Sequence, residues 1–241
     1  MRSELDHAKA AGFWLLHGFP YSGEELVQAM RERLRAWGKA RQAGAVIALA
    51  LVCSATFAQT GGLDIERRRS FTGGELALLP DICKDIQGMP TYVGPRGDYW
   101  RSVAGNVLEH AHHYCRGMRD LLFLRTVQIK PEHRRFLWDR AAGEMMYMIK
   151  AVPPNNPMQP EFWLHYGFAK MNFGDLAEAQ RAFEQSRTLK PDYWPAYTFW
   201  ADYLISNRQF DEARSVIELG LKQLPESPQL TQRLERIAQR R

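Results

Sequence analysis

The chain has no long acidic, collagenous or low-complexity segment, and it has only a small excess of positive charge. Over 241 residues it is 45% apolar and 24% charged, which is the composition of a globular protein of one or two domains. Its formal net charge of +5 is too small and too dispersed to form the concentrated basic face that nucleic acid requires. We therefore expect no nucleic-acid partner.

The sequence also lacks the common catalytic motifs. It contains no G-x-S-x-G elbow, no phosphate-binding loop and no H-E-x-x-H zinc motif. The glycine pairs in TGGL and TGGE are interpreted as linker glycines, because they lack the strand and helix that a cofactor loop needs. These absences predict that the protein is not an enzyme and has no cofactor.

The chain has no apolar run of the ~20 residues that span a bilayer comfortably. The run AGAVIALALVCSATFA, residues 43–58, follows a basic segment and ends in small residues that suit cleavage before Gln59. This pattern is typical of a secretory signal peptide over about residues 30–58. We expect export to the periplasm and no membrane span in the mature chain; an inner-membrane anchor through residues 43–58 is the alternative.

The signal would be preceded by an unusually long segment if the chain began at Met1. A start at Met30 would give a signal peptide with an ordinary basic front. We therefore expect residues 1–29 to reflect a start site placed too early. The targeting region then covers residues 1–58, and a linker follows over residues 59–79.

Cysteine is scarce. Export would remove Cys53 with the signal and leave two cysteines, Cys83 and Cys115, which lie 32 residues apart. An even count in an oxidising compartment favours a disulfide, which would stabilise the fold by roughly 3–4 kcal/mol for a loop of this length. A thiolate metal ligand is the alternative.

Two segments of the C-terminal half match at an offset of 34 residues. They begin at Pro160 and Trp194 and close at Pro191 and Pro225. Small residues at matched positions would let paired helices approach, and aromatic residues would fill the space between the pairs. The matched pairs are Trp163 with Tyr197, Tyr166 with Trp200, Gly167 with Ala201, Leu176 with Phe210, Ala179 with Ala213, and Phe183 with Ile217.

On these positions the chain resembles the tetratricopeptide repeat family. The resemblance implies an all-α fold of stacked antiparallel helix hairpins, with two repeats over residues 154–226 and a C-terminal capping helix over 227–241. A divergent N-terminal repeat is expected over residues 80–153, with helices at about 98–126 and over 131–153. The pairing of LPDIC with HHYC is also similar to a group of exported bacterial proteins of this family.

The resemblance further implies a concave face that binds a peptide or another protein. The chain would then be a non-catalytic interaction module or scaffold of the bacterial envelope. Apolar side chains in the groove would anchor the partner and polar ones would direct hydrogen bonds. The expected groove residues are Leu164, Phe168, Met171, Asn172, Thr198, Asp202, Ile205 and Ser206.

The stretch EHAHHYC, residues 109–115, is the other cluster of chemically active side chains. We interpret it as structural, with the histidines hydrogen-bonded and Cys115 bonded to Cys83. A metal- or haem-binding protein that uses His110, His113 and Cys115 is the alternative function.

Overall fold

The computed structural model describes residues 71–86 and 95–239. All regular secondary structure within these ranges is helical, which confirms the all-α prediction. The predicted signal at 30–58 and the segment 1–29 lie outside the described residues.

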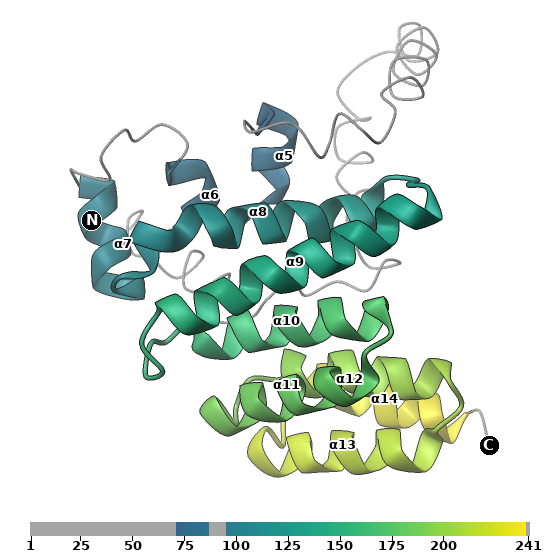
Figure 1. Ribbon diagram of the computed structural model, residues 1–241. Helices are drawn as coiled ribbons and strands as arrows, with labels where there is room; N and C mark the ends of the chain where they lie inside the picture. The colour runs from purple at the N-terminus through teal and green to yellow at the C-terminus, as the bar shows by residue number, and fades with distance from the viewer. Residues whose placement is uncertain (1–70, 87–94, 240–241) are drawn as a thin grey trace, which may run out of the picture.

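The helices follow one another along the chain with short connections (Figure 1). They are α5 (Gly73–Leu78), α6 (Asp81–Ile86), α7 (Pro95–Ala104), α8 (Val107–Thr126), α9 (Pro131–Ala151), α10 (Gln159–Phe173), α11 (Leu176–Leu189), α12 (Pro195–Ser206), α13 (Phe210–Gln223) and α14 (Pro228–Ala238).

Three antiparallel hairpins form the body of the protein. Helices α8 and α9, α10 and α11, and α12 and α13 pair with each other, and the hairpins stack in chain order (Figure 1). Helix α14 packs against α12 and α13 at the C-terminal end, as expected of a capping helix. Helices α6 and α7 pack against α8 at the other end.

The turns inside the two C-terminal hairpins occupy equivalent repeat positions. Gly174 ends α10 with φ +104°, and Arg208, 34 residues later, follows α12 with φ +62°. A left-handed conformation costs a residue with a Cβ roughly 1–2 kcal/mol, whereas glycine adopts it readily. The turn at Gly174 therefore has the residue that favours this conformation, and the turn at Arg208 does not.

Replacing Arg208 with glycine should stabilise the protein by about 1 kcal/mol, because it relieves this backbone strain. For a chain of this size we expect the melting temperature in a calorimetric scan to rise by about 2–4 °C. The control is Gly174→Ala, which should lower it. An Arg208→Gly variant that melts at or below the parent temperature would contradict the assignment.

The prediction of a single helix over 98–126 is wrong. The chain forms α7 and α8 instead, with a break at Gly105, where φ is +61°. The side chain of Asn156, between α9 and α10, donates a hydrogen bond to the Ala104 carbonyl at 2.8 Å and so satisfies the end of α7. The break lets α7 fold back onto α8.

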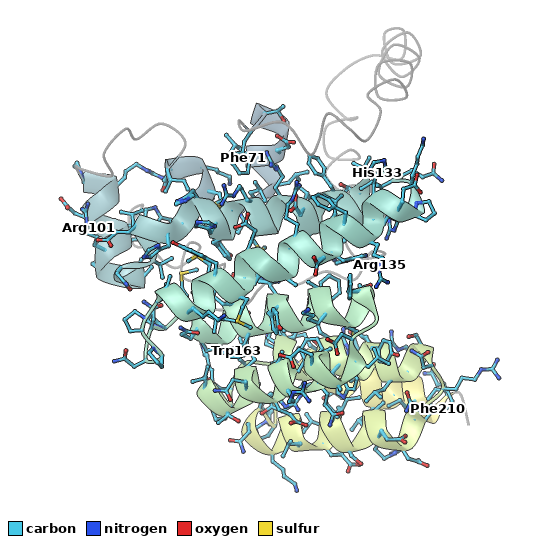
Figure 2. The ribbon with its side chains drawn as sticks, viewed as in Figure 1. Phe71, Arg101, His133, Arg135, Trp163 and Phe210 are labelled. Carbon is cyan, nitrogen blue, oxygen red and sulfur yellow. A yellow bond between two sulfur atoms is a disulfide. The ribbon has the colours of Figure 1, made fainter. Side chains whose placement is uncertain are left out.

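The segment expected to be a linker, residues 59–79, contains helix α5. The glycines of TGGE begin this helix, with Thr72 as its cap: the Thr72 hydroxyl accepts from the Glu75 amide at 3.2 Å, and the Glu75 carboxylate accepts from the Thr72 amide. Phe71, labelled in Figure 2, lies just before this helix. Its ring is 4.7 Å from the Arg119 guanidinium of α8. A capping box and one tertiary contact therefore stabilise a helix in a segment that its glycines had predicted to be a linker.

The predicted disulfide is confirmed. Cys83 of α6 and Cys115 of α8 are bonded, and both are fully buried. The bond ties the short N-terminal helices to the first hairpin across 32 residues of chain. The bond therefore stabilises the part of the fold whose helices are too short to be stable alone.

We expect the double variant Cys83→Ala, Cys115→Ala to lose about 3–4 kcal/mol of unfolding free energy, because its unfolded chain is no longer cross-linked. Urea unfolding followed by circular dichroism measures this loss. Wild-type protein reduced by dithiothreitol is the matched control and should unfold like the double variant. Equal urea midpoints for oxidised wild type and the double variant would show that the bond adds no stability.

Candidate functional site

A pocket lies where the first helices of the three hairpins meet. Its residues come from α8, α10 and α12, and those from α8 fall at helical spacings of three and four, so one face of that helix forms a wall. The lining is mostly apolar. The lining residues are Met118, Leu121, Leu122, Arg125 and Thr126 of α8, His165 and Phe168 of α10, and Phe199 of α12.

Phe168 organises the aromatic part of this pocket. Its ring makes edge-to-face contacts with Phe199 of α12 at 5.1 Å and with Trp138 of α9 at 5.5 Å between centroids. The Arg125 guanidinium lies 6.0 Å from the same ring. Contacts from three other helices hold the ring in place, so it can act as a preorganised apolar anchor.

Phe168 is the predicted groove residue that lines the pocket. Met171 is partly buried and packs against the C-terminal core. Asn172 is exposed one turn from Phe168, and its side chain donates to the Phe168 carbonyl at 2.9 Å. Of these three residues, only Phe168 lines the pocket.

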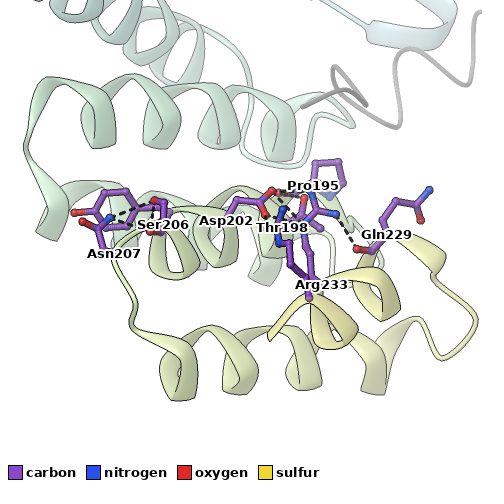
Figure 3. Close-up of polar contacts among 9 residues, drawn as sticks. Pro195, Thr198, Asp202, Ser206, Asn207, Gln229 and Arg233 are labelled. Carbon is purple, nitrogen blue, oxygen red and sulfur yellow. Dashed lines mark hydrogen bonds and ion pairs between the residues drawn. The ribbon is translucent and has the colours of Figure 1, made fainter. Parts of the chain in front are cut away.

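Three of the predicted groove residues lie inside the core. Leu164, Thr198 and Ile205 have exposed fractions of 0%, 1% and 3%. Thr198 donates its hydroxyl to the Pro195 carbonyl at 3.3 Å (Figure 3). The physical reason is that the next hairpin or the capping helix covers this stripe of each first helix, so these side chains stabilise the stack and do not face a partner.

Asp202 is bound by the capping helix. Both of its carboxylate oxygens accept hydrogen bonds from Arg233 of α14, at 2.6–3.1 Å (Figure 3). Arg236 forms a second ion pair with the same carboxylate. Ser206, near the end of α12, is exposed and donates to the Tyr203 carbonyl at 2.7 Å (Figure 3). Asp202 therefore presents a salt-bridge cluster, and not a free carboxylate, to the surface.

Sequence reasoning missed His165 and Phe199, although the repeat itself relates them. They are 34 residues apart, as are Phe168 and Asp202. Positions 165, 168 and 172 form one stripe of α10, and positions 199, 202 and 206 form the equivalent stripe of α12. The predicted set mixed this stripe with the buried one beside it, which contains positions 164 and 198.

A buried polar chain lies next to the pocket and joins the first hairpin to the second. The Tyr114 hydroxyl of α8 donates to Glu161 Oε1 of α10, and His165 Nε2 lies 3.7 Å from the same oxygen. These three side chains are at least nine-tenths buried. Burial and the Glu161 carboxylate raise the pKa of Tyr114 well above its usual value, so the phenol stays protonated and remains a donor.

Removing the Tyr114 hydroxyl should therefore destabilise the stack. We expect Tyr114→Phe to lower the unfolding free energy by about 2 kcal/mol, because the buried carboxylate loses a charge-assisted hydrogen bond. Urea titration provides the measurement. Tyr166→Phe deletes the same atom from a half-buried bond to Glu178 and should cost less. Equal losses for both variants would show that burial does not strengthen this bond.

Two histidines of EHAHHYC, His110 and His113, hold α8 and α9 together. His113 Nδ1 lies 2.6 Å from Glu144 Oε2, and its ring stacks on Tyr147 with centroids 3.6 Å apart. His110 Nδ1 shares a 3.2 Å hydrogen bond with the Tyr147 hydroxyl. Arg116 completes the cluster, with Nε 2.9 Å from Glu144 Oε1. Two helices thus meet through aromatic stacking and ion pairs.

The structure removes Cys115 from any metal-ligand set, because its sulfur is bonded to Cys83. In the ranges 71–86 and 95–239, no three His, Cys, Asp or Glu side chains gather as a possible metal site. The structural interpretation of EHAHHYC is the one that the contacts of His110 and His113 support.

The comparisons with known proteins agree with this architecture. A family model described as tetratricopeptide repeat matches residues 171–236, which run from the end of α10 into α14. This part of the chain is therefore tetratricopeptide repeat sequence, and such repeats are modules for protein–protein interaction. No curated protein and no solved structure matches the chain.

Among the residues that the structure describes, no helix combines the length and the apolar character needed to cross a bilayer. The apolar run 43–58 lies outside the described residues.

Proposed function

We propose that the protein is a non-catalytic interaction module of the bacterial envelope that binds a peptide or protein segment on its concave face. The observation that carries this proposal is the pocket shared by α8, α10 and α12. The first helices of stacked hairpins form an extended inner surface, and binding by such repeat proteins uses that surface. A hollow that needs all three hairpins is suited to capture an external side chain.

The side chains of the pocket favour recognition over chemistry. Met118, Leu121 and Leu122 provide an apolar wall, and Phe168 and Phe199 provide rigid rings against which a partner residue can pack. Buried apolar anchors of this kind carry most of the binding energy in protein interfaces. The surrounding polar groups then fix the orientation of the partner.

Two features support the envelope as its location. The segment 30–58 has the pattern of a secretory signal, and the bond between Cys83 and Cys115 suits an oxidising compartment. A scaffold there benefits from a covalent tie between its short N-terminal helices and its first hairpin. The partner would then be an exported protein or the periplasmic segment of a membrane protein.

Truncation of Phe168 tests the proposal. We expect tagged Phe168→Ala protein to retain about one tenth or less of the partner that wild type captures from native envelope extract, because an interface anchor contributes about 2 kcal/mol. Quantitative mass spectrometry measures the captured protein, and circular dichroism checks the fold.

Leu219→Ala is the matched control. Leu219 is a large apolar residue on α13 with an exposed fraction of 46%, and it does not line the pocket. Its truncation should leave capture unchanged. If Phe168→Ala, still folded, captures the same partners in the same amounts as wild type, the concave-face assignment fails.

A further inference from the structure

The pocket has one buried polar side chain in its mostly apolar lining, and this side chain is His165. Its side chain is 3% exposed, whereas Phe168 and Phe199, which line the same pocket, are only half-buried. The two phenylalanine rings therefore border the mouth of the pocket, and the imidazole lies deeper.

The hydrogen bonds of this imidazole are incomplete. Nε2 of His165 is buried and has no hydrogen-bond partner in the part of the chain that the structure describes. It lies 3.7 Å from Glu161 Oε1, which is beyond hydrogen-bond distance. The described residues provide no hydrogen bond to Nδ1 either. Native proteins pair most of their buried polar groups, so an imidazole without partners beside a pocket points to a bound group that completes it.

The same deficit extends behind the imidazole. Oε2 of Glu161 and the hydroxyl of Tyr193 are buried, and neither has a hydrogen-bond partner within residues 71–86 and 95–239. Burial and the Glu161 carboxylate raise the pKa of Tyr193 well above its usual value, so its phenol stays protonated close to this carboxylate. The inner end of the pocket thus belongs to a polar region with more hydrogen-bonding capacity than these residues use.

The carboxylate also determines which group the imidazole can accept. A neutral imidazole has one N–H and one lone pair. Glu161 favours the tautomer with the proton on Nε2, because that N–H then points toward a negative charge. Nδ1 of His165 is then an acceptor, and an entering group must supply a hydrogen-bond donor.

One acceptor in an apolar pocket favours a neutral group with a single donor. An ammonium group carries three donors and a charge that is costly to remove from water. A phenol has one O–H donor at the far end of an apolar ring. Its ring can remain at the mouth of the pocket while its hydroxyl reaches the deeper imidazole.

We propose that the occupant of the pocket is a tyrosine side chain of the partner, whose ring packs against Phe168 and Phe199 and whose hydroxyl donates to His165 Nδ1. Aromatic pairs of this kind contribute beyond the area that they bury. The inference rests on the proposed function and names the side chain that the partner places in the pocket.

Three blocked pentapeptides, Gly-Gly-X-Gly-Gly, test it against the full chain. The central residue X is tyrosine, phenylalanine or O-methyltyrosine, and the last of these keeps the oxygen but lacks the donor. The Met118 methyl group lines the pocket, so its signal in a carbon–proton spectrum of methionine-labelled protein measures binding. We expect the tyrosine peptide to bind with a Kd on the order of 1 mM. The other two should bind about fivefold to tenfold more weakly, because they cannot donate.

The nitrogen spectrum of the imidazole provides a measurement on the unaltered protein. The tyrosine peptide should shift the His165 Nδ1 resonance upfield in a long-range nitrogen–proton spectrum, because the lone pair of Nδ1 accepts a hydrogen bond. The phenylalanine peptide should leave this resonance in place. This measurement does not depend on the folding of any variant.

Replacing the histidine tests the acceptor. His165→Leu removes both ring nitrogens and keeps an apolar side chain, so it should bind the tyrosine and phenylalanine peptides with affinities equal within about twofold. His112→Leu is the matched control: His112 is an exposed histidine of α8 that does not line the pocket, and its loss should leave the preference for tyrosine intact. Thermal unfolding checks the fold of both variants.

The inference is overturned if the phenylalanine or O-methyltyrosine peptide binds as tightly as the tyrosine peptide. It is also overturned if the tyrosine peptide leaves the Met118 signal unchanged at about 10 mM. The capture experiment with Phe168→Ala judges the proposed function separately. Capture that depends on Phe168, together with no preference for tyrosine, refutes this inference alone.

Discussion

The close approach of paired helices is the constraint on which the rest of the structure depends. At Gly167 of α10 an added Cβ would lie 3.1 Å from the Ala182 Cβ and 3.2 Å from the Ala179 carbonyl of α11, so the two helices touch where both carry small residues. Gly117 plays the same part in the first hairpin, where a Cβ would meet Met145 of α9. Because each pair is this close, the large side chains must project to the faces between hairpins and to the concave surface.

The stack is joined by different means along its length. At the C-terminal end the aromatic and aliphatic core continues through α12, α13 and α14, and Asp202 binds the capping helix. At the N-terminal end the regular repeat is lost, and specific links take its place: the disulfide between α6 and α8, the His113–Glu144–Tyr147 cluster, and the bond from Tyr114 to Glu161. A divergent hairpin thus supplies one wall of a pocket whose other walls are regular repeats.

The same packing explains why the candidate site differs from the sequence prediction. Successive residues of a helix point about 100° apart, so Leu164 and His165 face different surroundings although they are neighbours in sequence. The stripe containing Leu164 and Thr198 is covered by neighbouring helices, whereas the stripe containing His165 and Phe168 borders the pocket. The 34-residue offset correctly related positions between repeats, but it did not show which stripe of each helix the neighbouring helices would cover.

The sequence alone determined the helical class, the hairpin repeat, the capping helix and the pairing of Cys83 with Cys115, because these features depend on local periodicity and cysteine count. The break at Gly105, the formation of helix α5 and the ion pairing of Asp202 with the capping helix depended on tertiary contacts. Asn156, Arg119 and Arg233 make those contacts from distant parts of the chain. Only the folded stack decides which side chains meet, because rotation of each helix about its axis is fixed by the helices packed against it.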